Sequence, residues 1–372
     1  MEKAQFVIND FLLFEEFCNL RCDYCGGFYP TDFVFRRDGD RLVYPQRWES
    51  TRKASTTLEE MLDQTPKITQ LFELASRVLE GLNDQFEYPI LKLSGGEVFL
   101  IKEICDFIEH SSKRFKAVQL LTNGTLLNES SIECIAQLGN VYIQLSLDGH
   151  NLEVNRARIK REELQRKILR NIEVIQKKGL SLEINCVLTK YNTKEFSAFA
   201  EYISQYPKVV IFPRPVRGES VEILHPDESA IKQFEESIKT VNPHVLPPSS
   251  YIDKLLSTLL HKKRAWKCYI PFFVMGTDMY GNLSRCTLCS GSTKVTNILE
   301  PDEDKLQSLK HKVSYNSDNN CISCPENCIT QYEMFNLYVE SMVNEEELKK
   351  VPIFRANGII ENIKEIKSSI KK

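Results

Sequence analysis

The chain has 372 residues, of which 42% are hydrophobic and 27% charged, and its formal net charge is −3 at pH 7. Such values are typical of a globular protein of two or three domains, and the small negative charge gives no reason to expect nucleic-acid binding. No apolar run reaches the roughly eighteen residues of a membrane span, and the N-terminus lacks the apolar region of a signal peptide. We therefore expect no membrane partner and a cytoplasmic location.

The first predicted strand covers residues 5–15 and leads directly into a cysteine motif. Cys18, Cys22 and Cys25 are separated by three residues and then by two, and the next cysteine is Cys105. Disulfides are rare in a reducing compartment, where clustered cysteines more often bind metal. A structural zinc site closes with four ligands, so three cysteines leave one metal position open. A zinc site and an iron–sulfur cluster are the two alternatives at this point.

Residues 28–58 interrupt the alternation of strands and helices. A hairpin is predicted around Asp38 and Gly39. It forms either a lid or substrate wall beside the cysteine motif, or a surface or dimer contact. The first helix is predicted over residues 65–82, with Thr65 as its cap and Pro66 in its first turn.

Short apolar segments alternate with amphipathic ones from residue 89 to about residue 212. Strands are predicted at 89–97, 117–124, 141–149, 181–189 and 208–215, with helices at 101–108, 128–139, 164–179 and 196–203. Six strands separated by helices indicate parallel strands with right-handed crossovers. We therefore predict an α/β fold, a partial (β/α)6 TIM-like barrel over residues 1–215. In such folds, ligands bind at the C-terminal ends of the strands.

Polar and glycine residues follow several predicted strands at those ends. Two glycines in the second strand's turn let the backbone approach a ligand closely, and a carboxylate follows them. Gly95, Gly96 and Glu97 are therefore candidate ligand-binding residues.

The C-terminal part contains a second group of cysteines. Residues 216–260 are rich in proline and polar residues and are predicted to be a connector. Residues 261–340 are predicted to form a cysteine-rich domain, and residues 341–372 a helical tail. The cysteines of the second group are Cys268, Cys286, Cys289, Cys321, Cys324 and Cys328.

The first cysteine motif, with Tyr24 before its last cysteine, resembles the signature of radical S-adenosylmethionine (SAM) enzymes. The resemblance implies a 4Fe–4S cluster on Cys18, Cys22 and Cys25, with SAM chelating the open iron. It also implies reductive cleavage of SAM to a 5′-deoxyadenosyl radical that abstracts a substrate hydrogen. An electron donor such as flavodoxin or ferredoxin is then needed.

The same resemblance implies roles for the residues at the strand ends. The Gly95-Gly96-Glu97 segment matches the one that binds the methionine amino group. Ser146 and Asp148 match positions that bind the ribose. Arg158 matches an arginine that pairs with the SAM carboxylate, a role suited to the bidentate guanidinium, and Arg156 competes with Arg158 for it. Asn123 lies in a turn on the substrate side, and Asn185 lies in the region that flanks adenine.

The second cysteine group resembles the SPASM and shorter twitch domains of radical SAM enzymes. That resemblance implies an auxiliary 4Fe–4S cluster on Cys268, Cys286, Cys321 and Cys324, with a zinc site as the alternative. Cys289 and Cys328 then remain as alternate ligands, as ligands of a second, incompletely ligated cluster, or as catalytic thiols that return a hydrogen atom to a substrate radical.

The expected function is modification of a ribosomally made peptide by cross-linking, thioether formation, epimerisation or oxidation. Seventeen residues precede Cys18, too few for an N-terminal leader-binding domain, so any leader would need a separate leader-binding protein or another surface. The alternatives are oxidation of a small-molecule alcohol, such as a sugar or aminocyclitol, and a non-catalytic iron–sulfur or zinc scaffold.

Overall fold

The computed structural model describes residues 3–13, 18–25, 36–38, 41–43, 68–100, 103–217, 220–286, 294–311 and 329–370. Within these ranges, no helix has both the length and the apolar character needed to cross a membrane. Four predicted metal ligands or catalytic thiols, Cys289, Cys321, Cys324 and Cys328, lie outside the described residues.

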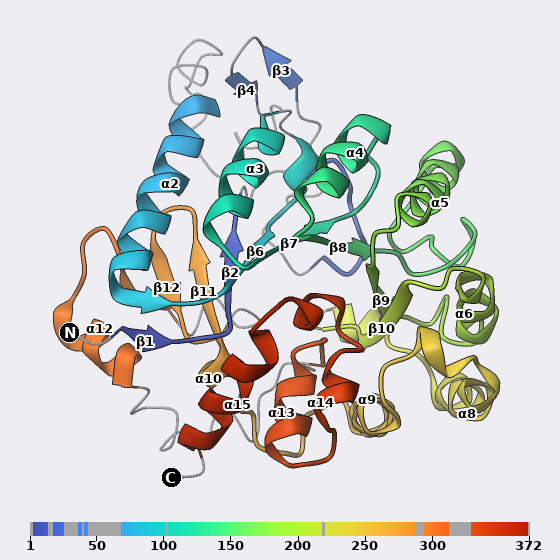
Figure 1. The fold of residues 1–372 in the computed structure, drawn as a ribbon. Coiled ribbons are helices and arrows are strands. Elements are labelled where there is room, and N and C mark those ends of the chain that lie inside the picture. Colours follow the sequence, from blue (N-terminus) through green and yellow to red (C-terminus); the bar gives the residue numbers. More distant parts are fainter. Residues whose placement is uncertain are drawn as a thin grey trace, which may run out of the picture.

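A nine-stranded sheet forms the centre of the described chain (Figure 1). Its strands are, in spatial order, β10 (Val209–Pro215), β9 (Leu182–Leu188), β8 (Val141–Ser146), β7 (Ala117–Thr122), β6 (Ile90–Ser94), β2 (Ile8–Leu12), β11 (Val274–Asp278), β12 (Asn282–Ser284) and β13 (Lys294–Asn297). From β10 to β2 every neighbouring pair is parallel. The predicted α/β fold, with six parallel strands in chain order, is therefore confirmed.

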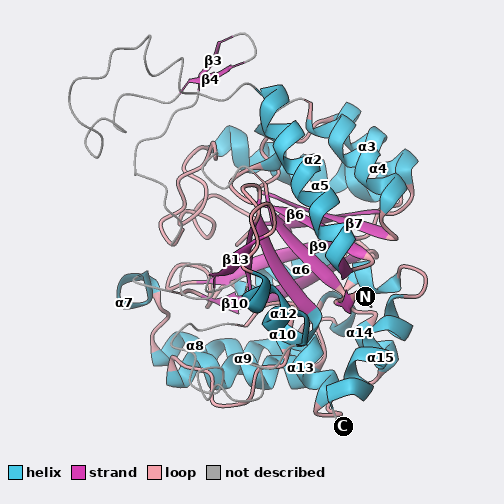
Figure 2. Cartoon of the chain, turned by 90° about the vertical axis from the view of Figure 1, so that its left-hand side faces the viewer, coloured by secondary structure: helices cyan, strands magenta, loops and turns pink. Residues whose placement is uncertain are grey.

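Helices cover the sheet on two sides (Figure 2). On one side lie α2 (Ile68–Gln85), α3 (Ile104–Arg114), α4 (Glu129–Leu138), α5 (Glu162–Lys177) and α6 (Phe196–Ser204), which follow one another in an arc around the strands (Figure 1). The C-terminal half adds α7 (Val221–Leu224), α8 (Glu228–Ser237), α9 (Ser249–His261), α10 (Ile270–Phe273), α12 (Glu303–His311), α13 (Glu333–Val339), α14 (Glu345–Leu348) and α15 (Ile359–Ile370). Of these, α8, α9 and α13 lie across the sheet from α2–α5 (Figure 2).

The C-terminal part is continuous with the parallel sheet. Strand β11 pairs in parallel with β2, and β12 and β13 add two antiparallel strands beyond it. The segment predicted to be a connector contains α7, α8 and α9, and Tyr251 and Leu255 of α9 are fully buried. The predicted domain boundaries at residues 215, 260 and 340 stay predictions.

Local sequence signals account for several element ends. The side chain of Asn128 caps α4 by accepting a hydrogen bond from the Ser131 amide, and Gly139 ends that helix with φ 74°. Gly179 follows α5 with the same φ of 74°. The predicted hairpin is present as the antiparallel pair β3 (Arg36–Asp38) and β4 (Arg41–Val43). The predicted cap Thr65 and Pro66 lie outside the described residues.

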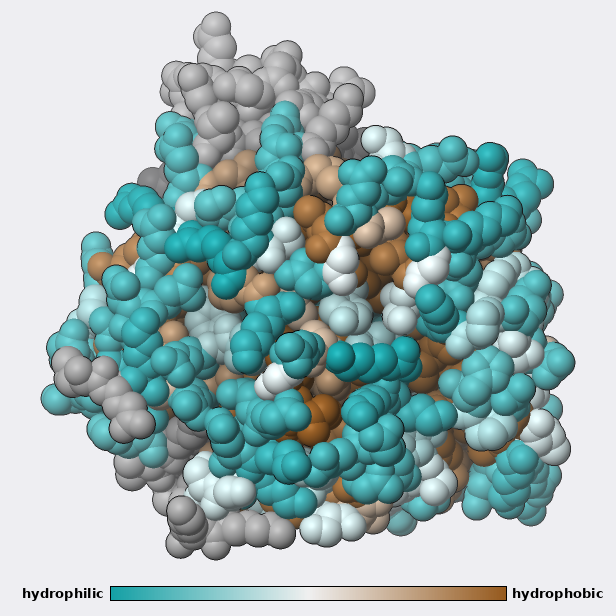
Figure 3. All heavy atoms as spheres, viewed as in Figure 1, coloured by the Kyte–Doolittle hydropathy of each residue, from teal (hydrophilic) through white to brown (hydrophobic). Residues whose placement is uncertain are grey.

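Hydrophobic residues gather between the sheet and the outer helices, whereas the surface in Figure 3 is mostly hydrophilic, with apolar side chains visible in gaps. In β7, β8 and β9 the residues facing these helices include Leu120, Ile143 and Ile184, each at most 1% exposed. The alternate residues Gln119, Gln144 and Glu183 are polar and equally buried. The inner face of the parallel sheet is therefore buried but polar.

Replacing Gly124 with alanine should lower the free energy of unfolding by about 2–4 kcal/mol. Gly124 has φ +76°, and a Cβ there would lie 2.5 Å from Cδ1 of the fully buried Leu145. Chemical denaturation measures the change. Gly139→Ala is a matched control, because φ is +74° but no atom lies within 4 Å of the added Cβ. Equal losses in the two variants would contradict the steric explanation.

Candidate active site

The first cysteine motif lies between β2 and the ends of the neighbouring strands. The Cys25 amide donates a hydrogen bond to the Cys22 carbonyl (3.1 Å), which closes the loop between them. The Leu20 amide and the Asn123 side-chain amide point at the Cys18 sulfur, at 3.4 and 3.9 Å. These donors would stabilise a thiolate at Cys18.

The three thiols lie close enough for their charges to interact. Burial raises the pKa of the Cys18 thiol to about 11, and the charges of Glu97 and Cys25 add to that effect. Burial raises the pKa of Cys22 to about 12, and Cys25 and Cys18 raise it further. A cationic metal centre is needed to hold such thiols deprotonated, because the thiolate is the form that ligates metal. The three-cysteine donor set therefore fits an iron–sulfur cluster.

A pocket of about 390 Å³ opens beside these cysteines. It is lined by Leu20, Arg21, Cys22, Asp23, Cys25, Tyr191, Ser220, Ile223 and Leu224. Nearby, Val187, Val216 and Leu224 form a small hydrophobic cluster, against which Tyr24 and Tyr191 pack. This combination of apolar walls and thiols provides space for an organic ligand next to the cluster site.

The Gly95-Gly96-Glu97 turn places a buried carboxylate beside the cysteine loop. Gly95 has φ 144°, which side-chain-bearing residues rarely adopt. The Glu97 carboxylate accepts hydrogen bonds from the Thr122 hydroxyl (2.7 Å) and from the amides of Asn123 (2.7 Å) and Phe99 (3.1 Å). Burial raises the pKa of Glu97, and these hydrogen bonds counteract the rise. The carboxylate is thus held in one orientation between β6 and β7.

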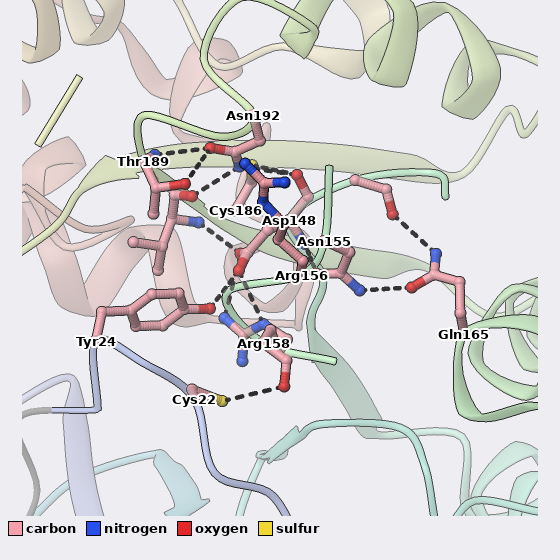
Figure 4. A network of polar contacts seen from close by, with 12 residues as sticks. Cys22, Tyr24, Asp148, Asn155, Arg156, Arg158, Gln165, Cys186, Thr189 and Asn192 are labelled. Carbon is pink, nitrogen blue, oxygen red and sulfur yellow. Dashed lines mark hydrogen bonds and ion pairs between the residues drawn. The ribbon is translucent and has the colours of Figure 1, made fainter. Parts of the chain in front are cut away.

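Asp148, which follows β8, is the centre of a polar network (Figure 4). Its carboxylate accepts two hydrogen bonds from Arg158, both at 3.2 Å, and one from the Val187 amide at 2.8 Å. The Tyr24 hydroxyl donates to the same carboxylate. Burial raises the pKa of Tyr24 well above its usual value, so the hydroxyl remains a donor. The network joins the end of β8 and the start of the following loop to the cysteine motif.

The two arginines that competed for one role occupy different environments. Arg158 is 7% exposed and pairs with Asp148, and its backbone carbonyl is 3.9 Å from the Cys22 sulfur. Arg156 is exposed, and its guanidinium lies 3.9 Å from the centre of the Tyr191 ring. The structure thus brings Arg158 into the Asp148 network and places Arg156 over Tyr191, a residue that lines the pocket.

The other predicted cofactor-binding residues lie at the same sheet edge. Ser146, the last residue of β8, is the register partner of Asn185, which lies in the middle of β9. The Asn185 side chain accepts a hydrogen bond from Arg214. Asn123 donates to Asn19 at 3.0 Å, which connects the end of β7 to the cysteine loop. All eight predicted residues therefore lie around one edge, and their roles toward SAM stay predictions.

Two of the predicted auxiliary ligands, Cys268 and Cys286, are described. Burial raises the pKa of Cys268 to about 12; the charge of Arg264 lowers it, and the charges of Glu333 and Cys286 raise it further. Cys268 therefore lies within electrostatic reach of Cys286 and of the ion pair of Arg264 and Glu333, whose atoms are 2.6 Å apart. The other predicted ligands lie outside the described residues, and the shared metal site stays a prediction.

Sequence reasoning missed a group of buried polar residues on the inner face of the sheet. Asp10 on β2 accepts hydrogen bonds from the Ser94 hydroxyl (2.7 Å) and the Tyr332 hydroxyl (2.8 Å). Lys92 on β6 lies 3.5 Å from Asp10 and 4.9 Å from the centre of the Tyr332 ring. The signal in the sequence is a polar residue inside each of the apolar strands, such as Asp10 in β2 and Lys92 in β6.

A model of the radical SAM superfamily matches residues 12–203, just over half of the chain. The chain therefore belongs to the radical SAM superfamily, whose members use a 4Fe–4S cluster and SAM. Its relatives include SPASM/twitch-type peptide maturases.

Three curated relatives share about a fifth of their residues with this chain. It is 22% identical over 238 residues to an Fe-coproporphyrin III synthase of Methanosarcina barkeri, covering 59% of this chain and 58% of the relative. It is 22% identical over 227 residues to the subtilosin biosynthesis protein AlbA of Bacillus subtilis, covering 60% and 50%. It is 22% identical over 240 residues to the mycofactocin maturase MftC of Mycolicibacterium smegmatis, covering 62% and 56%. The matches thus span only half to three fifths of these relatives.

Solved structures share the fold. Streptococcus suis SuiB bound to the precursor peptide SuiA has a TM-score of 0.53 at 15% identity, covering 86% of this chain and 66% of that one. The enzyme anSMEcpe with bound AdoMet and a peptide also has a TM-score of 0.53, at 16% identity, covering 85% and 88%. At these identities the likeness establishes the fold alone.

Proposed function

We propose that this chain is a radical SAM enzyme that modifies a ribosomally made peptide. In the proposal, Cys18, Cys22 and Cys25 hold the 4Fe–4S cluster, and Glu97, Asp148 and Arg158 surround the SAM that completes it. When bound, the cluster and SAM supply a 5′-deoxyadenosyl radical that abstracts a substrate hydrogen atom. The observation that carries the proposal is that Arg158 and Tyr24 connect the cysteine motif to Asp148. Both side chains contact the Asp148 carboxylate, and the Arg158 backbone carbonyl lies next to the Cys22 sulfur.

Comparison with relatives supports a peptide substrate. AlbA is named for bacteriocin biosynthesis, MftC is named a maturase, and SuiB was solved with a precursor peptide. The name of the Fe-coproporphyrin III synthase instead speaks for a small molecule, so oxidation or remodelling of a small substrate is the second candidate.

The roles of the second cysteine group belong to the same proposal. Cys268, Cys286, Cys321 and Cys324 would hold one auxiliary 4Fe–4S cluster, and the electrostatic interaction between Cys268 and Cys286 supports this set. Cys289 and Cys328 would ligate a second cluster or return a hydrogen atom to the substrate. A flavodoxin or ferredoxin would supply the electron, and a separate protein would present the peptide leader.

SAM cleavage tests the chemistry. After anaerobic reconstitution, the wild-type enzyme with SAM and dithionite should form 5′-deoxyadenosine, measured by liquid chromatography and mass spectrometry. The triple variant Cys18→Ala/Cys22→Ala/Cys25→Ala should form none above background, because the thiolates that hold the cluster are gone. Equal product in the two proteins would refute the proposal.

Iron and substrate measurements test the finer parts. About eight iron atoms per chain supports one auxiliary cluster, whereas about four contradicts any. Short peptides encoded beside the gene are the first substrates to try, against sugar and aminocyclitol alcohols. Transfer of deuterium from a labelled candidate into 5′-deoxyadenosine would identify the substrate and the attacked carbon.

A further inference from the structure

The inner face of the sheet carries buried polar atoms that lack partners. The Glu183 carboxylate accepts hydrogen bonds from the side-chain amides of Gln119 (3.3 Å) and Gln144. Within the described part of the chain, the carbonyl oxygens of both glutamines, Oε1, are buried without a hydrogen-bond partner. Gln119 is 1% and Gln144 0% exposed. Two acceptors are thus fixed in position by Glu183 and left unused.

Two donors lie unused between this face and the Asp148 network. Arg214 on β10 donates through Nη2 to Asn185 and to Gln331 Oε1, the latter at 3.3 Å. Two further donor atoms are buried with no partner among the described residues: Nε of Arg214 and Nε2 of Gln331. Gln331 is 1% exposed. Burial lowers the pKa of Arg214, and the charges of Glu183 and Arg158 also act on it. Arg214 therefore lies within electrostatic reach of both the inner face and the Asp148 network.

Unpartnered buried polar groups are costly and rare in folded proteins. A set of them on one face is completed by water or by a bound ligand with matching polar atoms. The charges around Arg214 and Lys92 indicate which kind of ligand atom would bind to Arg214. Among the described residues, its guanidinium donates to the neutral amides of Asn185 and Gln331, whereas Lys92 already has Asp10 as its counter-ion. An oxygen with negative charge is therefore favoured near Arg214.

We propose that Arg214 and Gln331 bind a carboxylate or carbonyl oxygen of the substrate on the inner face of the sheet, while Gln119 and Gln144 accept hydrogen bonds from the same molecule. This inference rests on the proposed function and names the substrate group that the enzyme recognises. A peptide supplies both kinds of atom, since each residue carries a carbonyl oxygen and an N–H group. Gln331 comes from the segment before α13, so the C-terminal part of the chain contributes to substrate selection.

The substitution Gln331→Glu tests the donor with little change in shape. It keeps an oxygen facing Arg214, removes the Nε2 donor and adds a negative charge. The probes are N-acetylglycine, which has a free carboxylate, and N-acetylglycinamide, which has only neutral carbonyls. Both are titrated against the reconstituted full-length enzyme with SAM, by ligand-observed NMR.

We expect the wild type to bind at least one probe, and Gln331→Glu to weaken that binding by about tenfold or more. Loss confined to N-acetylglycine identifies a substrate carboxylate, and loss of both identifies a main-chain carbonyl. Arg214→Lys, which keeps the charge but lacks the Nε–H donor, should act in the same direction. Gln205→Glu, the same change at an exposed glutamine, should leave probe binding unchanged.

No probe binding to the wild type, or equal binding to wild type and both inner-face variants, would overturn the inference. Thermal unfolding of each variant shows whether a loss reflects misfolding. The proposed function fails separately, through absence of 5′-deoxyadenosine from the wild type. An enzyme that cleaves SAM but binds the probes independently of Arg214 and Gln331 would retain the function and lose only this site.

Discussion

Replacing Glu333 with alanine should lower the free energy of unfolding by about 3–5 kcal/mol. Glu333 and Arg264 form an ion pair with side chains 0% and 1% exposed. The Glu333 carboxylate also accepts hydrogen bonds from the indole of Trp266 (2.6 Å) and the amide of Asn336 (2.9 Å). The substitution removes the carboxylate on which these donors converge, so the buried arginine loses its counter-ion. Denaturation by guanidinium chloride, followed by circular dichroism, measures the loss.

A partly exposed ion pair next to the same helix is the control. Glu340 caps the C-terminal end of α13 and pairs with Lys254 at 3.6 Å, with side chains 26% and 18% exposed. Glu340→Ala should cost about 1 kcal/mol or less, because solvent screens the pair. If Glu333→Ala and Glu340→Ala lower the free energy of unfolding by the same small amount, burial of the Arg264–Glu333 pair does not stabilise the C-terminal part.

Replacing Asp148 with alanine should lower the rate of 5′-deoxyadenosine formation by about a hundredfold or more. The substitution removes the acceptor for Arg158, Tyr24 and the Val187 amide at once. Arg158 then has a buried charge without its counter-ion, and the cysteine loop loses the contact through Tyr24. The rate is measured at saturating dithionite, together with iron content and SAM affinity.

Two further variants separate charge from shape. Asp148→Asn keeps an oxygen for the Val187 amide but removes the charge, so its rate should lie between wild type and alanine. Glu109→Ala removes a surface carboxylate that pairs with Lys113 on the same helix, and its rate should equal that of the wild type. A fully active Asp148→Ala protein with normal iron content would show that the network has no part in SAM cleavage.

Local sequence patterns correctly predicted the parallel sheet and the edge formed by the C-terminal ends of its strands. Each strand is an apolar segment of a few residues ended by turn-forming residues, and such local signals need no knowledge of distant contacts. Asn128 and Gly139 fixed the ends of α4 for the same reason, because a cap acts within one helical turn. Parallel strands in chain order then place their C-terminal ends at one edge, which brought Glu97, Asp148 and Asn185 together.

The polar inner face was not predictable from those patterns. A polar residue such as Gln119, Gln144 or Glu183 within a strand predicts a solvent-exposed position. Alternation of apolar and polar residues usually means that one face of the sheet is exposed to water. Each is instead at most 1% exposed. The reason lies in distant segments: Tyr332 reaches Asp10 across 322 residues, and Gln331 reaches Arg214 across 117. Local sequence carries no information about such pairings.

The sequence by itself determined the cysteine motif, the order of the parallel strands and the edge where polar residues gather, since all three depend on spacing along the chain. Only the tertiary structure decided that Arg158 pairs with Asp148 while Arg156 lies over the ring of Tyr191. It alone brought the segment before α13 onto the inner face. These outcomes depend on burial and on contacts between remote segments, which exist once the chain has folded and are not encoded in any single stretch of it.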